Sequence, residues 1–222
     1  MANCGFQMLR VSNPMCLWPH SNGIAASAGA LHHMKLVLIF PSLEKALGDL
    51  HVVFATTARE RTTSTQALSL EMAVHLALQH HREGVKVGFL FGPERAGLTN
   101  DALSLCTAAV RIPTALDFSS LNLSQAVLLV THAFFRAFET SIYNVQAHSK
   151  RSHASSFVAT QAEIFAFLAH FQTVLSEEGY FAAPERKARM MWTLRNFFER
   201  ALPTQQELKS LWGALTHLLQ KR

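Results

Sequence analysis

Apolar residues come in short runs that alternate with helically spaced stretches over the first two thirds of the chain. Continuous apolar runs are typical of buried strands, and they fall at residues 8–11, 35–40, 50–56, 85–92 and 108–112. Helical spacing lies between and after them, at residues 43–47, 68–80, 101–106 and 123–145. Because strands separated by helices form βαβ units, this pattern predicts an α/β fold with a mainly parallel sheet.

The pattern changes at about residue 147. Residues 147–156 are small and polar, which is typical of a linker, and three helical stripes follow them. Two of these helices begin with a capping box, in which a Thr and a Glu three positions later bond each other's backbone N–H: Thr160 with Glu163, and Thr204 with Glu207. The sequence therefore predicts an α/β domain (1–148), a linker (149–159) and a helical C-terminal extension (160–222).

Composition is that of a globular protein able to bury a core. Hydrophobic residues make up 49% and charged residues 16% of the 222 residues. No strictly apolar run, residues 36–40 included, is long enough to cross a bilayer, and no export signal is apparent. The three cysteines form no CxxC pair, and the adjacent histidines at 32–33 and 80–81 are poorly spaced for chelation. We expect a cytoplasmic protein with no membrane partner and no metal.

The net charge of the chain is compatible with a nucleic-acid partner. Lys and Arg outnumber Asp and Glu by 20 to 15, a formal net charge of +5, and the pI is ≈ 9.4. A basic surplus makes a polyanion a reasonable partner, although many basic proteins bind no nucleic acid. Charge alone therefore does not select a function.

Three polar loops each follow a predicted strand, at residues 56–63, 92–100 and 113–122. Ligands of parallel sheets bind beyond the carboxyl ends of the strands, so we expect these loops on one rim. In the second loop, Gly92 allows close approach of the backbone to a ligand, beside the charges of Glu94 and Arg95. The alternative is a strand-to-helix turn with a solvated ion pair.

The other two loops carry further candidates. Ser119, Ser120 and Asn122 gather where the long helix begins. One N-cap accounts for one of these residues, and the free N–H groups there suit an anionic or electron-rich ligand group. Arg59 and Arg61 in the first loop either hold phosphates through bidentate contacts or are simply solvated.

Taken together, the three loops resemble the motifs of a known family. Residues 91–100 match F-G-x-E-x-x-G-L-x-N, residues 112–126 match I-P-x6-S-L-N-L-x-x-A, and residues 57–61 match (S/T)-A-R-x-R. The chain resembles the SpoU/TrmH family of the SPOUT superfamily of RNA 2′-O-methyltransferases, and within it the TrmJ type. That type methylates the first nucleotide of the tRNA anticodon loop, position 32, on cytidine or uridine. The resemblance covers essentially the whole chain, including the helical extension with its turn at residues 178–181.

The resemblance implies a fold, a cofactor and a set of site residues. The fold is a SPOUT fold with a C-terminal trefoil knot, which binds S-adenosyl-L-methionine and works as a homodimer on tRNA. Arg59 and Arg61 are implied to contact RNA. Catalytic positions are implied at Glu94, Ser120 and Asn122. Cofactor-binding positions are implied at Thr56, Thr57, Ala58, Gly92, Ile112, Ser119, Ser120 and Leu121.

One family feature is missing. The arginine of the first motif, N-x-G-x-x-x-R on the first helix, is absent, because residues 1–14 align just after that motif. We therefore expect an N-terminally truncated chain with little or no transferase activity, whose true start lies upstream; the alternative is an inactive relative. Two rival functions stay open: an rRNA 2′-O-methyltransferase, and a non-catalytic RNA-binding relative of the family.

Overall fold

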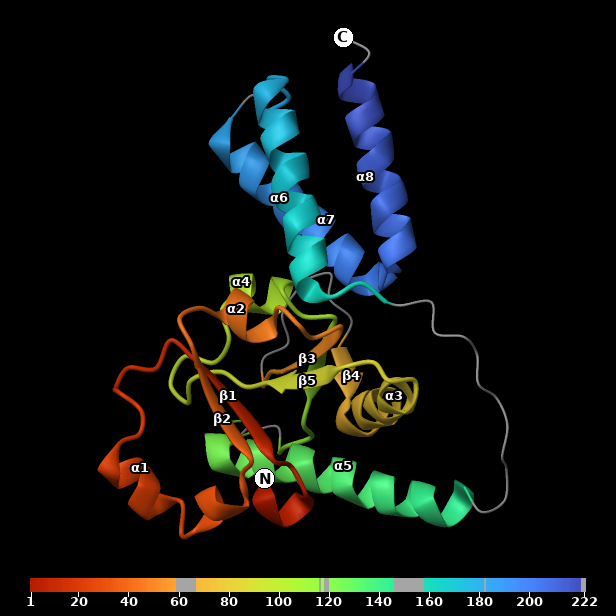
Figure 1. The fold of residues 1–222 in the computed structure, drawn as a ribbon. Coiled ribbons are helices and arrows are strands. Elements are labelled where there is room, and N and C mark those ends of the chain that lie inside the picture. The colour runs from red at the N-terminus through yellow and green to blue at the C-terminus, as the bar shows by residue number, and fades with distance from the viewer. Residues whose placement is uncertain (59–66, 116, 118–119, 146–157, 182, 221–222) are drawn as a thin grey trace.

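A computed structural model describes residues 1–58, 67–115, 117, 120–145, 158–181 and 183–220. Strands and helices alternate through the first two thirds of the chain, and helices alone make up the last third (Figure 1). The strands are β1 (Met8–Ser12), β2 (Leu36–Phe40), β3 (Val52–Thr56), β4 (Ala67–Ser69), β5 (Val87–Leu90) and β6 (Ala108–Arg111). The helices among them are the 3-10 helices η1 (Ala2–Cys4) and η2 (Ala30–His33), and α1 (Ser21–Ala26), α2 (Leu43–Leu47), α3 (Leu70–Arg82), α4 (Asn100–Ser104) and α5 (Leu123–Val145).

All paired strands of the two sheets are parallel, as predicted. The larger sheet has the order β4-β6-β3-β5, and β1 pairs with β2 in a separate sheet. Two details differ from the sequence-based expectation. The described strands form two sheets where one was expected, and neither β4 nor α1 was predicted. Both are short, at three and six residues, and so give too few positions for a periodic signal.

The core lies on both faces of β3, one of the two interior strands of the larger sheet. Val52, Val53, Phe54 and Ala55 are all at most 2% exposed, which explains why this strand reads as an unbroken apolar run. Side chains of Val52 and Phe54 pack with α3 and α5, whereas those of Val53 and Ala55 pack with α2 and α4. The sheet is thus covered by helices on both sides, which leaves its strand ends to carry the site.

The C-terminal extension consists of α6 (Gln161–Glu177), α7 (Pro184–Ala201) and α8 (Gln205–Gln220). Both predicted capping boxes form: Thr160 and Glu163 bond reciprocally, and so do Thr204 and Glu207. The apolar stripes bury one another around a cluster of Ala159, Ile164, Phe167, Leu168, Phe198 and Leu208. The extension therefore has a core of its own.

The extension rests on the α/β part at the amino end of β3 (Figure 1). The backbone N–H of Gln161 donates to the carbonyl of Leu50 at 2.8 Å, and that of Ala162 to the carbonyl of Gly48 at 3.0 Å. Phe165 packs against the apolar cluster on the α2 face of the sheet. Most of the predicted linker, residues 149–157, lies outside the described residues, and the bridge between Val158 and Thr204 follows it.

Candidate active site

The site begins with three neighbouring strand ends. Since β3 pairs with β5 on one side and β6 on the other, all in parallel, their carboxyl ends meet at one edge of the sheet. The hydroxyl of Thr56 donates to the carbonyl of Leu90 at 3.1 Å, and the N–H of Thr57 donates to the carbonyl of Val110 at 3.0 Å. The loop after β3 is thereby tied to both neighbours. We call this edge, with the loops that leave it, the carboxyl-end rim.

The loop after β5 closes tightly on itself at Gly92. A Cβ built on Gly92 would lie 2.5 Å from both the carbonyl carbon of Gly97 and the nitrogen of Leu98. Gly97 has a φ of +66°, which favours glycine, and its N–H donates to the carbonyl of Pro93 at 2.8 Å. Both glycines of the loop are thus required by its geometry. The turn between them presents Glu94 to solvent.

The loops after β5 and β6 meet through two polar side chains. The amide Nδ2 of Asn122 donates to Oε1 of Glu94 at 3.0 Å, across 28 positions of sequence. Asn122 stands directly before α5, and its Oδ1 accepts the N–H of Ser124 at 2.8 Å, as an N-cap does. Both side chains are exposed. The arrangement therefore offers a carboxylate and an amide, paired and open to solvent, at the start of a long helix.

Most of the remaining predicted site residues lie at the carboxyl-end rim, and three lie outside the described residues. Gly92, Ile112 and Leu121 are half-buried, as are Thr56 and Thr57, whereas Ala58 and Ser120 are exposed; all belong to the loops of the carboxyl-end rim. Ile112 also packs against the core cluster beneath α3 and α5. Ser119, Arg59 and Arg61 lie outside the described residues.

Sequence reasoning missed two residues that touch Asn122. Ser124 donates both its N–H and its hydroxyl to Oδ1 of Asn122, and Oε1 of Gln125 accepts the backbone N–H of Asn122. The signal was present in the sequence, because Asn-x-x-Gln is a variant of the capping-box pattern. Both residues fall at positions that the family motif leaves unspecified.

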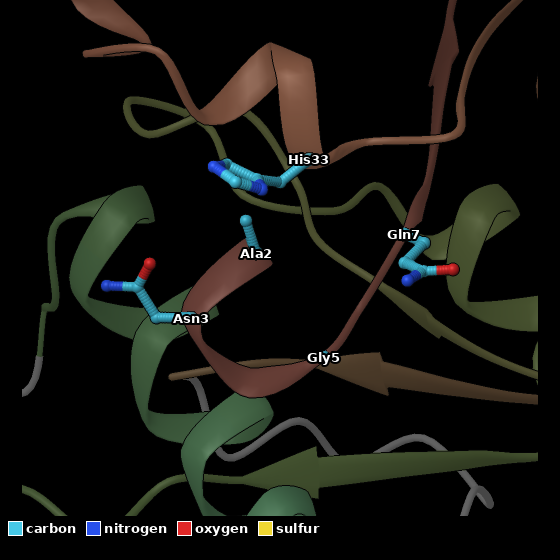
Figure 2. A pocket seen from close by; sticks show the side chains of 5 residues that line it. All are labelled: Ala2, Asn3, Gly5, Gln7 and His33. Carbon is cyan, nitrogen blue, oxygen red and sulfur yellow. The ribbon is translucent and has the colours of Figure 1, made fainter.

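Two surface hollows lie away from the carboxyl-end rim. One, of about 340 Å³, is lined by Ala2, Asn3, Gly5, Gln7 and His33; Figure 2 shows His33 of η2 on one side of it and Ala2 and Asn3 of η1 on the other. The second, of about 390 Å³, lies between α6 and α8 beside Trp212. Neither contains a residue predicted for the site.

Metal-binding clusters and membrane-spanning helices are both absent from the described part of the chain. No group of three or more His, Cys, Asp or Glu side chains there is placed to hold a metal ion. Within the same residues, each helix is too short or too polar to traverse a lipid bilayer.

Comparisons with known proteins match both parts of the chain to one family. Residues 1–132 match the SpoU rRNA Methylase family, and residues 162–222 match the tRNA methyltransferase TrmJ, C-terminal domain. The tRNA (cytidine/uridine/adenosine-2′-O-)-methyltransferase TrmJ of Pseudomonas aeruginosa is 30% identical over 97% of this chain and 84% of its own length. The tRNA (cytidine/uridine-2′-O-)-methyltransferase TrmJ of Photorhabdus laumondii is 34% identical over 97% of this chain and 87% of its own length.

A solved structure extends the likeness to three dimensions. TrmJ from Z. mobilis ZM4 superposes with a TM-score of 0.83 at 31% identity, over 98% of this chain and 89% of that one. The likeness thus spans the α/β part and the C-terminal extension together. The chain belongs to the SpoU methylase family and, within it, to the TrmJ methyltransferases.

Proposed function

We propose that this protein is an S-adenosyl-L-methionine-dependent tRNA 2′-O-methyltransferase that acts on cytidine or uridine at the first nucleotide of the anticodon loop. The observation that carries the proposal is the contact between Asn122 and Glu94, which joins the second and third family motifs at one rim. The names of the TrmJ relatives support the tRNA substrate. The anticodon-loop position follows from the family resemblance.

The carboxyl-end rim fits the proposed cofactor. Adenosine is commonly held by backbone groups at strand ends, which requires loops without bulky side chains. Gly92 suits this need because it carries no side chain, and the loop closes so tightly against it that a Cβ would meet the backbone of Gly97 and Leu98. The residues that would hold the cofactor are Thr56, Thr57, Ala58, Gly92, Ile112, Ser119, Ser120 and Leu121. We propose that the chain beyond β6 forms the trefoil knot of the SPOUT fold around them.

The chemistry is a displacement at an activated methyl carbon. S-adenosyl-L-methionine, when bound, supplies a sulfonium methyl group, whose carbon forms a bond to the ribose 2′-oxygen as its bond to sulfur breaks. The hydroxyl proton must leave at the same time. Asn122 occupies Oε1 of Glu94, so the other carboxylate oxygen is the one to accept that proton. Ser120, exposed two residues before Asn122, would orient the ribose.

The RNA surface and the subunit arrangement belong to the same proposal. A net charge of +5 suits a tRNA partner, and Arg59 and Arg61 are proposed to contact its phosphates. We propose a homodimer, because α5 exposes large apolar side chains that a second subunit would cover: Leu128 is 54%, Leu129 42% and Phe138 40% exposed. We also propose three parts of the chain: an α/β domain (1–148), a linker (149–159) and a C-terminal extension (160–222). A cytoplasmic location is proposed because tRNA is modified there.

The test is methylation of defined transcripts. The protein is incubated with S-adenosyl-L-methionine and either a tRNA or an rRNA fragment, and the nucleosides are analysed by mass spectrometry. A 2′-O-methylated nucleoside in the anticodon loop is expected. Methylation of the rRNA fragment alone would make the protein an rRNA methyltransferase instead. The expectation of little or no transferase activity without the first-motif arginine stays a prediction, and the yield in the same assay measures it.

Calorimetry separates the enzyme from a non-catalytic RNA-binding relative. The proposal expects saturable binding of S-adenosyl-L-methionine that weakens at least tenfold in Asn122→Ala. Asn22→Ala in the short helix α1 is the matched control, because its side chain is exposed, and we expect it to bind as the wild type does. Tight tRNA binding without any cofactor binding would favour the non-catalytic relative.

A further inference from the structure

The first turn of α5 surrounds Asn122 with hydrogen bonds. Oδ1 of Asn122 accepts the backbone N–H of Ser124 at 2.8 Å and the hydroxyl of Ser124 at 2.6 Å. The backbone N–H of Asn122 donates to Oε1 of Gln125 at 3.1 Å, and its carbonyl accepts the N–H of Ala126 at 3.0 Å. Both the main chain and the side chain of Asn122 are thus fixed by the same turn.

These contacts determine which way the amide of Asn122 points. The backbone N–H of Ser124 is an obligatory donor, so the amide atom that faces it must be the oxygen. The amide nitrogen then faces the other way, toward the carboxylate of Glu94. A reversed amide would set its nitrogen against the N–H of Ser124 and its oxygen against the carboxylate, and would lose both bonds.

Helix capping alone does not account for the hydroxyl of Ser124. An N-cap requires that Oδ1 of Asn122 accept a backbone N–H, and the N–H of Ser124 already meets this need. The hydroxyl bond satisfies no further backbone group, and it strengthens only the hold on the side-chain oxygen. Gln125 acts on the opposite side, where it holds the main chain of Asn122 in the manner of a capping box.

We propose that Ser124 and Gln125 are positioning residues for ribose methylation: they hold Asn122 so that its amide fixes the carboxylate of Glu94 at the reacting ribose. The inference rests on the proposed function and adds two residues that the family motif leaves unspecified. Neither residue touches the substrate in this account. Each acts through Asn122.

Steady-state kinetics on the full chain provides the first test. Loss of one neutral hydrogen bond corresponds to about a 2- to 10-fold effect, so Ser124→Ala and Gln125→Met should each lower kcat for tRNA methylation by about that factor. The KM for S-adenosyl-L-methionine should change less than about twofold, since the cofactor contacts remain. Ser124→Thr and Gln125→Glu keep the hydroxyl and the acceptor oxygen, and should restore kcat.

The control is a serine whose hydroxyl bonds only the helix backbone. Ser176 in α6 donates to the carbonyl of Gln172 at 2.7 Å, so Ser176→Ala should leave kcat unchanged. If Ser124→Ala is as active as the wild type while Asn122→Ala is inactive, the positioning inference is wrong and the proposed function stands. A protein that neither binds cofactor nor methylates RNA overturns the proposed function, and this inference with it.

A double-mutant cycle tests whether Ser124 acts through Glu94. In a Glu94→Gln background, Ser124→Ala should cause little further loss of kcat, because the pair it supports is already altered. NMR gives a readout that does not depend on activity. Glu94→Gln should shift the side-chain amide resonances of Asn122 in the wild-type background, and this shift should shrink in Ser124→Ala. Additive kinetic effects together with an undiminished shift would overturn the proposal.

Discussion

Two polar side chains of the carboxyl-end rim are open to solvent, whereas at the opposite rim, where the C-terminal extension meets the amino end of β3, a polar pair is buried. Glu94 and Asn122 at the first rim are exposed. At the second, Gln161 is fully buried and Glu199 is 1% exposed, joined by a 2.8 Å bond from Nε2 of Gln161 to Oε2 of Glu199. One rim keeps its hydrogen-bonding groups available to a ligand, and the other uses them to attach a domain.

The difference predicts where substitutions act. A change at the buried rim removes packing or leaves a buried polar group unpaired, so its effect is mainly on the free energy of unfolding. A change at the exposed rim meets water and few neighbours, so its effect is mainly on binding and turnover. Substitutions that violate this separation would show that the two rims are coupled.

The largest stability loss is expected in the core of the extension. Ile164 is fully buried there, and Ile→Ala changes at such sites cost about 2–5 kcal/mol. Binding of S-adenosyl-L-methionine should stay within about twofold of wild type below the unfolding transition, because the rim that would bind it is far from Ile164. Urea denaturation followed by circular dichroism, together with calorimetry, measures both. Leu218→Ala, at a side chain 67% exposed, is the control and should change stability by less than about 0.5 kcal/mol.

At Gly92 we expect the effect on cofactor binding to exceed the effect on stability. In Gly92→Ala the new Cβ would lie 2.5 Å from backbone atoms of Gly97 and Leu98, so the loop must move. Overpacking of this kind costs about 1–3 kcal/mol, and the displaced loop should weaken cofactor binding at least tenfold. Gly213→Ala in α8 has nothing within 4 Å of its Cβ and should leave binding unchanged. Unweakened binding in Gly92→Ala would remove Gly92 from the proposed cofactor site.

Much of this architecture was readable from the sequence. The buried strand β3, the helix bounds of α2 and α5 and the capping box at Thr160 and Glu163 all follow from local patterns, because period, length and cap chemistry act within a few residues. The motifs also led to Glu94 and Asn122, which the structure places 3.0 Å apart.

The parts that could not be predicted depend on tertiary contacts. No local pattern indicates that α6 begins on the carbonyls of Gly48 and Leu50, or that Gln161 and Glu199 are buried together. A Glu in an amphipathic helix is ordinarily solvated, and only the docking of the extension removes Glu199 from water. The split into two sheets likewise depends on which strands pair with one another, and the pattern within a single strand does not indicate its partner.

A pH effect should distinguish the buried rim from the exposed one. Burial raises the pKa of Glu199 to about 8, against the smaller opposing effects of the bond from Gln161 and the charge of Arg195. Among the described residues, Oε1 of Glu199 and Oε1 of Gln161 are both buried acceptors with no hydrogen-bond partner. A proton on Glu199 turns one of these acceptors into a donor, which agrees with the direction of the pKa shift.

The sign follows from the two protonation states. The folded chain binds this proton up to about pH 8, whereas the unfolded chain releases it near pH 4.5, so folding takes up a proton between these values. The stabilising contribution is complete below pH 4.5 and is lost as the pH rises toward 8. Glu199→Gln should flatten this slope and stabilise the protein at pH 8 by on the order of 1–2 kcal/mol. A parallel pH slope in Glu199→Gln, measured by urea denaturation, would assign the effect to another group.

The smallest effect is expected at Asp49, an exposed carboxylate shortly before the amino end of β3. Arg10 of β1 bonds it, with Nη2 to Oδ2 at 3.0 Å, and Nζ of Lys86 lies 3.3 Å from the same oxygen. These cations, the bond from Arg10 foremost, lower the pKa of Asp49 from 3.8 to about 2. The pair therefore stabilises the fold above pH 3.8, and its contribution is lost as the pH falls through 2.

Solvent decides the size of that contribution. The side chain of Asp49 is 50% exposed, and exposed ion pairs contribute about 0–1 kcal/mol because water and salt screen them. Asp49→Asn should therefore lower stability by less than about 1 kcal/mol at pH 7, less still in 1 M NaCl, and by a smaller amount again at pH 2, where the carboxylate is partly protonated. Glu44→Gln, an exposed carboxylate of α2, is the matched control. A loss of stability in Asp49→Asn as large as the gain expected in Glu199→Gln, or a loss that does not decrease in salt, would contradict this prediction. It would mean that the ion pair of Asp49 and Arg10 is shielded from solvent.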